Sequence, residues 1–412
     1  MLKKISVQQV RIGMFVQSLE GSWLAHPFWK TKFLLQEPAD LDALLSSGVP
    51  MLVIDTERGL DVSDARPTAP PEQQVSPPTA EPAAAAKPKS EDQRAPTSMA
   101  AEMARANILV NRSREAVTSM FGEARLGKAL DADQCLPIVE EISNSVSRNP
   151  SALISLARLK TKDNYTYMHS VAVCALMVSL AKQLGLSDEQ TREAGLAGLL
   201  HDIGKMAMPM DVLNKPGKLT DAEFNVIRSH PVRGYQMLKE GASVPTGALD
   251  VCLHHHEKMD GTGYPKKLKG EQISLLARMG AVCDVYDAIT STRPYKSAWD
   301  PAGSIQRMAQ WAGDHFDPVV FKAFVKSVGI YPVGSLVKLE SGRLAVVSEL
   351  NAASLAAPVV RVFYSTRSSM PIPVLTLDLS HPSTRDKVLS RETPSDWGFS
   401  YLDDIWQQPG GA

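Results

Sequence analysis

A run of helical periodicity from residue 99 to residue 329 constrains the fold of this 412-residue chain more than any other feature. Helix start signals recur within it. Ser187 precedes Gln190 at the spacing of a capping box, and Asp300 places an N-cap residue before Pro301, which suits a first helical position. The pattern predicts a large all-helical domain over residues 99–329, with its core at 150–328.

The flanking segments follow other patterns, so the predicted fold is mainly α with two smaller parts. Residues 1–60 combine strand-like alternation with one helical segment, which predicts a small α+β domain. Residues 61–98 are rich in Pro, Ala and Ser and cannot offset the entropy of ordering, so they are expected to form a partly stiff linker. Residues 330–378 switch to strand periodicity and predict a small β subdomain. Residues 379–412 are expected to be a C-terminal tail whose aromatic side chains pack on the helical domain or bind a partner.

Composition limits the classes of function. The net charge of −1 gives no overall field that would draw the chain to a nucleic acid polymer or a membrane. The four cysteines show no CxxC spacing and are expected to be buried free thiols in a reducing compartment. The N-terminus lacks the apolar segment of a signal peptide, and no apolar run approaches the ~20 residues of a membrane span, so we expect a cytoplasmic protein.

Histidine and aspartate side chains recur along the helical stretch in a pattern typical of a metal centre. A buried ionised carboxylate costs several kcal/mol unless a partner neutralises it, and a cation would also order histidines that point inward. Each histidine alone could be an ordinary core or surface residue, whereas the combination predicts a catalytic metal site. Orientation alone leaves open which two of three consecutive histidines would bind. The candidates are His169, His201, Asp202, His230, His254, His255, His256 and Asp284.

The types of ligand indicate the chemistry. Imidazole and carboxylate together suit iron, manganese, zinc, cobalt or nickel rather than calcium. Two such metals ~3.5–4 Å apart activate a bridging water as hydroxide and clamp a phosphorus centre for in-line displacement. The two oxygens of Asp202 could bridge such a pair. Lys205 follows His201 by one helical turn and could reach a phosphoryl oxygen, so Asp202 and Lys205 are the predicted catalytic residues.

Two later segments are candidates for substrate binding. Arg293 and Lys296 follow the helix that carries Asp284 and could hold phosphate, although an ordinary solvated loop fits them nearly as well. The glycines of DGTGYP permit close approach of the backbone to a ligand, but a structural turn explains them equally. The residues concerned in that loop are Gly261, Gly263 and Tyr264.

HDIGK, the HHExxDGxGYP run and DVYDAxTSxRPY closely resemble the HD-GYP domain, a subgroup of the HD phosphohydrolases. The segment VRIGMFVQSLEGSWLAHPF resembles a small domain often found ahead of HD-GYP domains. The resemblance implies an all-helical catalytic domain that hydrolyses the bacterial signalling molecule cyclic di-GMP to linear pGpG, and in many cases on to GMP.

Carried over residue by residue, the resemblance also implies roles. Lys205, Arg293 and Lys296 would bind phosphate or guanine, whereas His254 falls outside the family pattern. Asp287 and Asp163 would lie behind the ligands and support them. Tyr165 occupies the position where some relatives have a glutamate and hold three metals, so we expect two metals, iron or manganese first and zinc, cobalt or nickel as alternatives. The metal ligands would be His169, His201, Asp202, His230, His255, His256 and Asp284, with Asp202 bridging.

Other hypotheses stay open on the sequence. The domain could bind cyclic di-GMP, or a signalling partner through the GYP loop, with little turnover. It could also be an HD hydrolase of another nucleotide. The N-terminal domain could regulate the enzyme, form a homodimer or cover the active site.

Overall fold

The structure is a computed structural model. It divides into two units, Met1–Ala85 and Ala86–Ala412, which are described separately. The described residues are 2–19, 33–35, 41, 44–45, 51–62, 94–159, 165–215, 217–291, 298–351 and 353–407. Most of the predicted linker, residues 63–93, lies outside them.

The first unit contains a four-stranded antiparallel sheet in the order β1-β4-β2-β3. Its core includes Val16, Leu52 and Ile54, which are fully buried. Strand β1 was not expected from the sequence. It is an edge strand whose first three residues are exposed, so its apolar alternation is weak. The strands are β1 (Leu2–Ser6), β2 (Phe15–Leu19), β3 (Phe33–Leu34) and β4 (Met51–Asp55).

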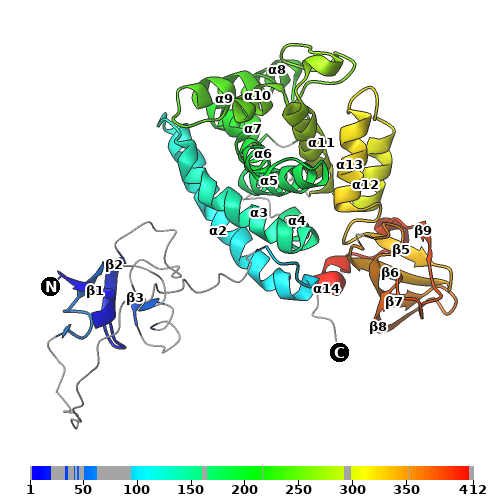
Figure 1. The fold of residues 1–412 in the computed structure, drawn as a ribbon, viewed down its shortest axis with the longest axis horizontal. Helices are drawn as coiled ribbons and strands as arrows, with labels where there is room; N and C mark the ends of the chain where they lie inside the picture. Colours follow the sequence, from blue (N-terminus) through cyan, green and yellow to red (C-terminus); the bar gives the residue numbers. More distant parts are fainter. Residues whose placement is uncertain are drawn as a thin grey trace, which may run out of the picture. The chain divides into compact units, whose positions relative to one another are not determined.

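The second unit is a helical bundle followed by a sheet, which confirms the predicted fold class. Figure 1 shows α5 and α6 in the middle of the bundle, with α2, α3 and α4 along one side and α12 and α13 along another. A helix that is apolar on all faces belongs in a core, and α5 is buried along most of its length. The longer helices are α2 (Met99–Arg125), α3 (Leu136–Arg148), α4 (Pro150–Arg158), α5 (Tyr165–Gln183), α6 (Asp188–Leu200), α9 (His230–Lys239), α10 (Thr246–His254), α11 (Leu275–Thr290), α12 (Pro301–Ala309) and α13 (Pro318–Val328).

The predicted start signals act as expected at these helices. Ser187 and Gln190 form a capping box at the start of α6. Asp300 accepts a hydrogen bond from the backbone N–H of Gly303 at the start of α12. No helix in the described part of the chain has the length and apolar character needed to cross a membrane.

One predicted helix is divided in the structure, at His230. The chain forms α8 (Asp221–Ile227), turns, and resumes as α9, whose first residue is His230. Pro231 has no N–H to offer the carbonyl of Ile227, four residues earlier, so the regular helix cannot continue. The Nδ1 atom of His230 takes that place, 2.7 Å from the Ile227 carbonyl oxygen. The break therefore orients a candidate metal ligand.

The C-terminal sheet is antiparallel and has the order β8-β7-β6-β5-β9. The segment 379–412, expected as a tail, contributes strand β9 to this sheet. That strand is only four residues long and mostly half-buried, so its periodicity is weak. Helix α14 (Leu402–Gln407) then places Trp406 in the core of the helical domain. The strands are β5 (Leu336–Leu339), β6 (Arg343–Glu349), β7 (Val359–Ser365), β8 (Met370–Asp378) and β9 (Val388–Arg391).

Candidate metal centre

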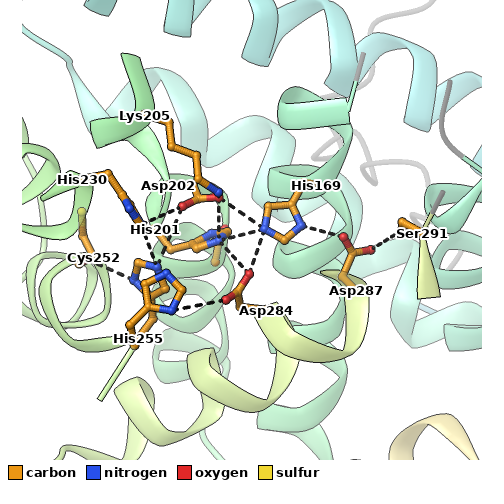
Figure 2. Close-up of polar contacts among 12 residues, drawn as sticks. His169, His201, Asp202, Lys205, His230, Cys252, His255, Asp284, Asp287 and Ser291 are labelled. Atoms are coloured by element: carbon orange, nitrogen blue, oxygen red, sulfur yellow. Dashed lines mark hydrogen bonds and ion pairs between the residues drawn. The ribbon is translucent and has the colours of Figure 1, made fainter. Parts of the chain in front are cut away.

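Five segments of the helical domain bring the seven predicted ligands together (Figure 2). Helix α5 supplies His169, and α9 and α11 supply His230 and Asp284. The two doublets, expected on helices, lie instead just past the ends of α6 and α10. His201 is the residue after α6, and Asp202 is the N-cap residue of the 3-10 helix η6 (Ile203–Ala207).

Six of the seven ligands fall into two groups. One consists of His169, His201 and Asp202, and the other of His230, His255 and His256. Within each group the potential ligand atoms lie within 4.8 Å of one another. This arrangement offers two positions for a cation.

Asp202 lies between the two groups and presents one oxygen to each. Its Oδ2 is 3.3 Å from Nε2 of His169 and 3.4 Å from Nε2 of His201. Its Oδ1 is 3.2 Å from Nε2 of His230. Among the described residues, this buried Oδ1 accepts no hydrogen bond. A buried carboxylate oxygen without a donor is costly, and a bound cation would satisfy it.

Backbone carbonyls hold the Nδ1 atoms of three ligand histidines. The Nδ1 atoms of His201 and His230 each lie 2.7 Å from a carbonyl oxygen, that of Gly198 and of Ile227 respectively. The Nδ1 atom of His255 lies 2.9 Å from the carbonyl oxygen of Val251. Only an N–H can donate to a carbonyl, so Nδ1 carries the proton and Nε2 is left as the potential ligand atom.

The Nε2 atoms accordingly face one another. Those of His169 and His201 are 3.2 Å apart, and those of His230 and His255 are 3.3 Å apart. Two nitrogen lone pairs at this distance repel unless a proton or a cation lies between them. The donor set therefore fits a metal in each group.

The pKa values of the ligand histidines also fit a bound cation. Burial lowers the pKa of His256 to about 3 and that of His255 well below its usual range, which keeps both rings neutral. Burial also opposes protonation of His201, but the carboxylates of Asp202 and Asp284 outweigh it and raise the pKa to about 10. The carboxylates thus draw positive charge to this position, which a metal cation would supply in place of a proton.

Asp284 spans the two groups from the side of α11. Its Oδ1 lies 3.0 Å from Nε2 of His169, and its Oδ2 lies 3.8 Å from Nδ1 of His256. His256 therefore presents Nδ1 to the centre where the other histidines present Nε2. Its ring stacks on Tyr264, with ring centroids 4.7 Å apart and planes inclined at 26°.

Lys205 is ion-paired with Oδ2 of Asp202 (Figure 2). Its side chain is 21% exposed, so the ammonium group lies at the rim of the site. Gly204 is required beside it, because a Cβ atom at that position would lie 1.9 Å from the carbonyl oxygen of His230. The glycine thus allows η6 to pack against the start of α9.

The GYP loop is built around a residue that the sequence analysis missed. Glu257 is buried, and its carboxylate accepts hydrogen bonds from the backbone N–H groups of Lys266, at 2.6 Å, and Leu268, at 3.0 Å. A Cβ atom on Gly263 would lie 2.5 Å from Cα of Glu257, so this glycine serves packing within the loop. Gly261 has a φ of +84°, which favours glycine. The one available signal for Glu257 was its place directly after two candidate ligands.

Of the remaining predicted residues, the structure describes two, Asp287 and His254. Asp287 lies behind His169, with its Oδ2 2.6 Å from Nδ1 of that ring. His254 points to Asp250, at 2.7 Å. Asp163, Arg293 and Lys296 lie outside the described residues.

An all-helical domain with these convergent histidines and aspartates defines an HD-type domain. A family model described as "HD domain" matches residues 141–320, and another, "Domain of unknown function (DUF3391)", matches residues 2–135. A cyclic di-GMP phosphodiesterase of Pseudomonas aeruginosa is 56% identical over 98% of this chain and 96% of its own length. The chain belongs to the HD-GYP family of HD-domain proteins.

Other relatives match less than half of the chain. The cyclic di-GMP phosphodiesterase response regulator RpfG of Xanthomonas campestris is 40% identical over 48% of this chain and 53% of its own length. The 3'3'-cGAMP-specific phosphodiesterase 3 of Vibrio cholerae is 36% identical over 42% of this chain and 37% of its own length. Relatives named for different cyclic dinucleotides thus match part of this chain.

Proposed function

We propose that the protein is a cyclic di-GMP phosphodiesterase that opens the ring of its substrate at a two-metal centre, giving linear pGpG, GMP or both. Family membership and the named relatives support the substrate. The observation that carries the mechanism is the position of Asp202, with one oxygen toward each histidine group and Oδ1 without a hydrogen bond among the described residues.

Each part of the chain has a defined task in this proposal. When bound, the metals supply an activated water and neutralise charge on the phosphodiester. Carbonyls behind His201, His230 and His255 hold Nε2 toward the centre, so little reorganisation is needed on binding. The ligands would be His169, His201, Asp202, His230, His255, His256 and Asp284.

Lys205 bears on how the substrate is bound, and the chemical types of the ligands bear on which metal is bound. The Lys205 ammonium, paired with Asp202 at the rim, is a fixed cation beside the position of the phosphodiester. Neutral imidazoles and carboxylates suit iron or manganese, with zinc, cobalt and nickel as alternatives. Arg293 and Lys296 remain candidate substrate contacts. A signalling partner at the GYP loop, a homodimer and a cytoplasmic location also stay predictions.

Anaerobic purification followed by elemental analysis and chromatographic turnover assays tests the proposal. The wild type should hold two metals and convert cyclic di-GMP, and Asp202→Ala should lose both metal and turnover. The matched control is His254→Ala, because His254 adjoins two proposed ligands but bonds to Asp250. This variant should retain metal content and turnover.

Two results would contradict the proposal separately. Metal-loaded wild type that leaves cyclic di-GMP intact, or that prefers 3'3'-cGAMP, would overturn the substrate. Asp202→Ala with wild-type turnover and two bound metals would overturn the mechanism.

A further inference from the structure

Four side chains form a stack that leads away from the candidate metal centre, here called the Arg228 stack. His256, a proposed ligand, stacks on Tyr264. The guanidinium carbon of Arg228 lies 4.6 Å from the centroid of the Tyr264 ring and 5.9 Å from that of Phe224. Arg228 follows the last residue of α8, one turn after Phe224 and two residues before His230.

The guanidinium of Arg228 keeps its hydrogen-bonding capacity. No carboxylate in the described part of the chain lies within ion-pair distance of it, and the carboxylates of Asp202 and Asp284 pair with other residues. The contacts with Tyr264 and Phe224 are cation–π contacts, which orient the planar group and use none of its five N–H donors. The side chain is half-buried, so its orientation is restrained while part of it stays accessible to a ligand.

A planar group that only donates hydrogen bonds discriminates between purines. Guanine presents two adjacent acceptors, N7 and O6, which match the arginine fork. Adenine replaces O6 with an N6 amino donor, which would face another donor. Lysine lacks the fork, so an arginine in cation–π contact with two rings is suited to guanine in particular.

We propose that Arg228 is a specificity-determining residue that binds the N7 and O6 edge of a guanine base of the substrate. The inference rests on the proposed function, because a phosphodiester held at the metals carries its bases one sugar away. Tyr264 is one ring removed from the proposed ligand His256, and Arg228 is the next layer. The stack therefore extends from the reacting phosphate to the base.

Two variants and a matched control test this role in the metal-loaded full chain. Arg228→Ala should lower kcat/KM for cyclic di-GMP about tenfold to hundredfold relative to kcat/KM for bis(p-nitrophenyl) phosphate, which has no purine. Selectivity for cyclic di-GMP over cyclic di-AMP should fall by a similar factor. Arg228→Lys should lose most of this selectivity although it keeps the charge. Arg233→Ala, which removes an exposed arginine of α9, should preserve both ratios.

The outcomes separate this inference from the proposed function. Unchanged ratios in Arg228→Ala would overturn the role of Arg228. Equal losses on all substrates, or a loss of metal by elemental analysis, would also overturn it, because they would show a structural role. Wild type that cleaves only bis(p-nitrophenyl) phosphate would refute the proposed function. In that case, equilibrium Kd values for cyclic di-GMP and cyclic di-AMP in wild type and Arg228→Ala decide the role of Arg228.

Discussion

Oδ2 of Asp287 lies 2.6 Å from Nδ1 of His169, and both side chains are buried. The contact turns Nε2 of His169 toward Asp202 and Asp284. Carboxylates behind a ligand histidine fix its tautomer and raise its basicity, and their loss costs 10- to 100-fold in metal affinity or activity, roughly. We therefore expect Asp287→Ala to weaken metal binding by about that factor, as measured by competition with a chelator.

Ser291→Ala is the control for this prediction. The Ser291 hydroxyl donates to the other oxygen of Asp287 over 3.4 Å, a long contact, so its removal should change metal affinity only slightly. Wild-type affinity in Asp287→Ala would show that the contact does not orient the ligand.

Glu257 should determine the conformation of the GYP loop. Glu257→Ala leaves the N–H groups of Lys266 and Leu268 without their acceptor, which costs about 1–3 kcal/mol for each group that stays buried. We expect faster amide hydrogen exchange across 257–268 and a higher KM for cyclic di-GMP. Glu271→Ala, at an exposed position of the following turn, should leave both unchanged. Unaltered exchange in Glu257→Ala would refute this role.

The candidate metal ligands could be predicted from the sequence, because few polar residues occur in otherwise apolar segments and each needs a partner when it is buried. The orientation of their side chains could not be predicted. His201 and His255 follow the last residues of α6 and α10, and backbone carbonyls in the last turn of each helix hold Nδ1 of each ring. Such bonds depend on where a helix ends, which periodicity locates only to within a few residues. The role of Glu257 could not be predicted either, because its partners are backbone N–H groups, which residue types do not reveal.

Metal removal should destabilise the protein, by an amount that grows with the logarithm of its affinity for the metal. A ligand that binds only the folded state adds about 2.7 kcal/mol at a concentration 100 times its Kd, so a chelator should lower Tm. The Tm of Asp202→Ala, which lacks the proposed bridge, should not respond to the chelator. Calorimetry with and without chelator measures both. An equal Tm decrease in the two proteins would place the responsible metal elsewhere.

Asp317 should stabilise the fold by an amount that decreases at acid pH. Its Oδ1 accepts from the N–H groups of Val319, at 2.7 Å, and Val320, at 3.2 Å, and its Oδ2 accepts from Arg278 at 2.8 Å. Burial alone would raise the pKa of Asp317, but these partners outweigh it and lower the pKa below the usual 3.8. A lowered pKa means that the folded state favours the carboxylate. The contribution is therefore complete above 3.8 and is lost as the pH falls through the folded-state pKa.

Asp317→Ala removes this N-cap of α13 and should lower the free energy of unfolding by about 1–2 kcal/mol at pH 7. The difference from wild type should stay constant down to about pH 5 and shrink below about pH 4, because the carboxylate is protonated first in the unfolded state and then, below its lowered pKa, in the folded state. Denaturant unfolding at a series of pH values measures it. Asp396→Ala, at an exposed aspartate, serves as the control and should show no such pH-dependent difference. A difference between Asp317→Ala and wild type that is equally large at pH 3 and pH 7 would mean that the charge of Asp317 contributes nothing to capping α13.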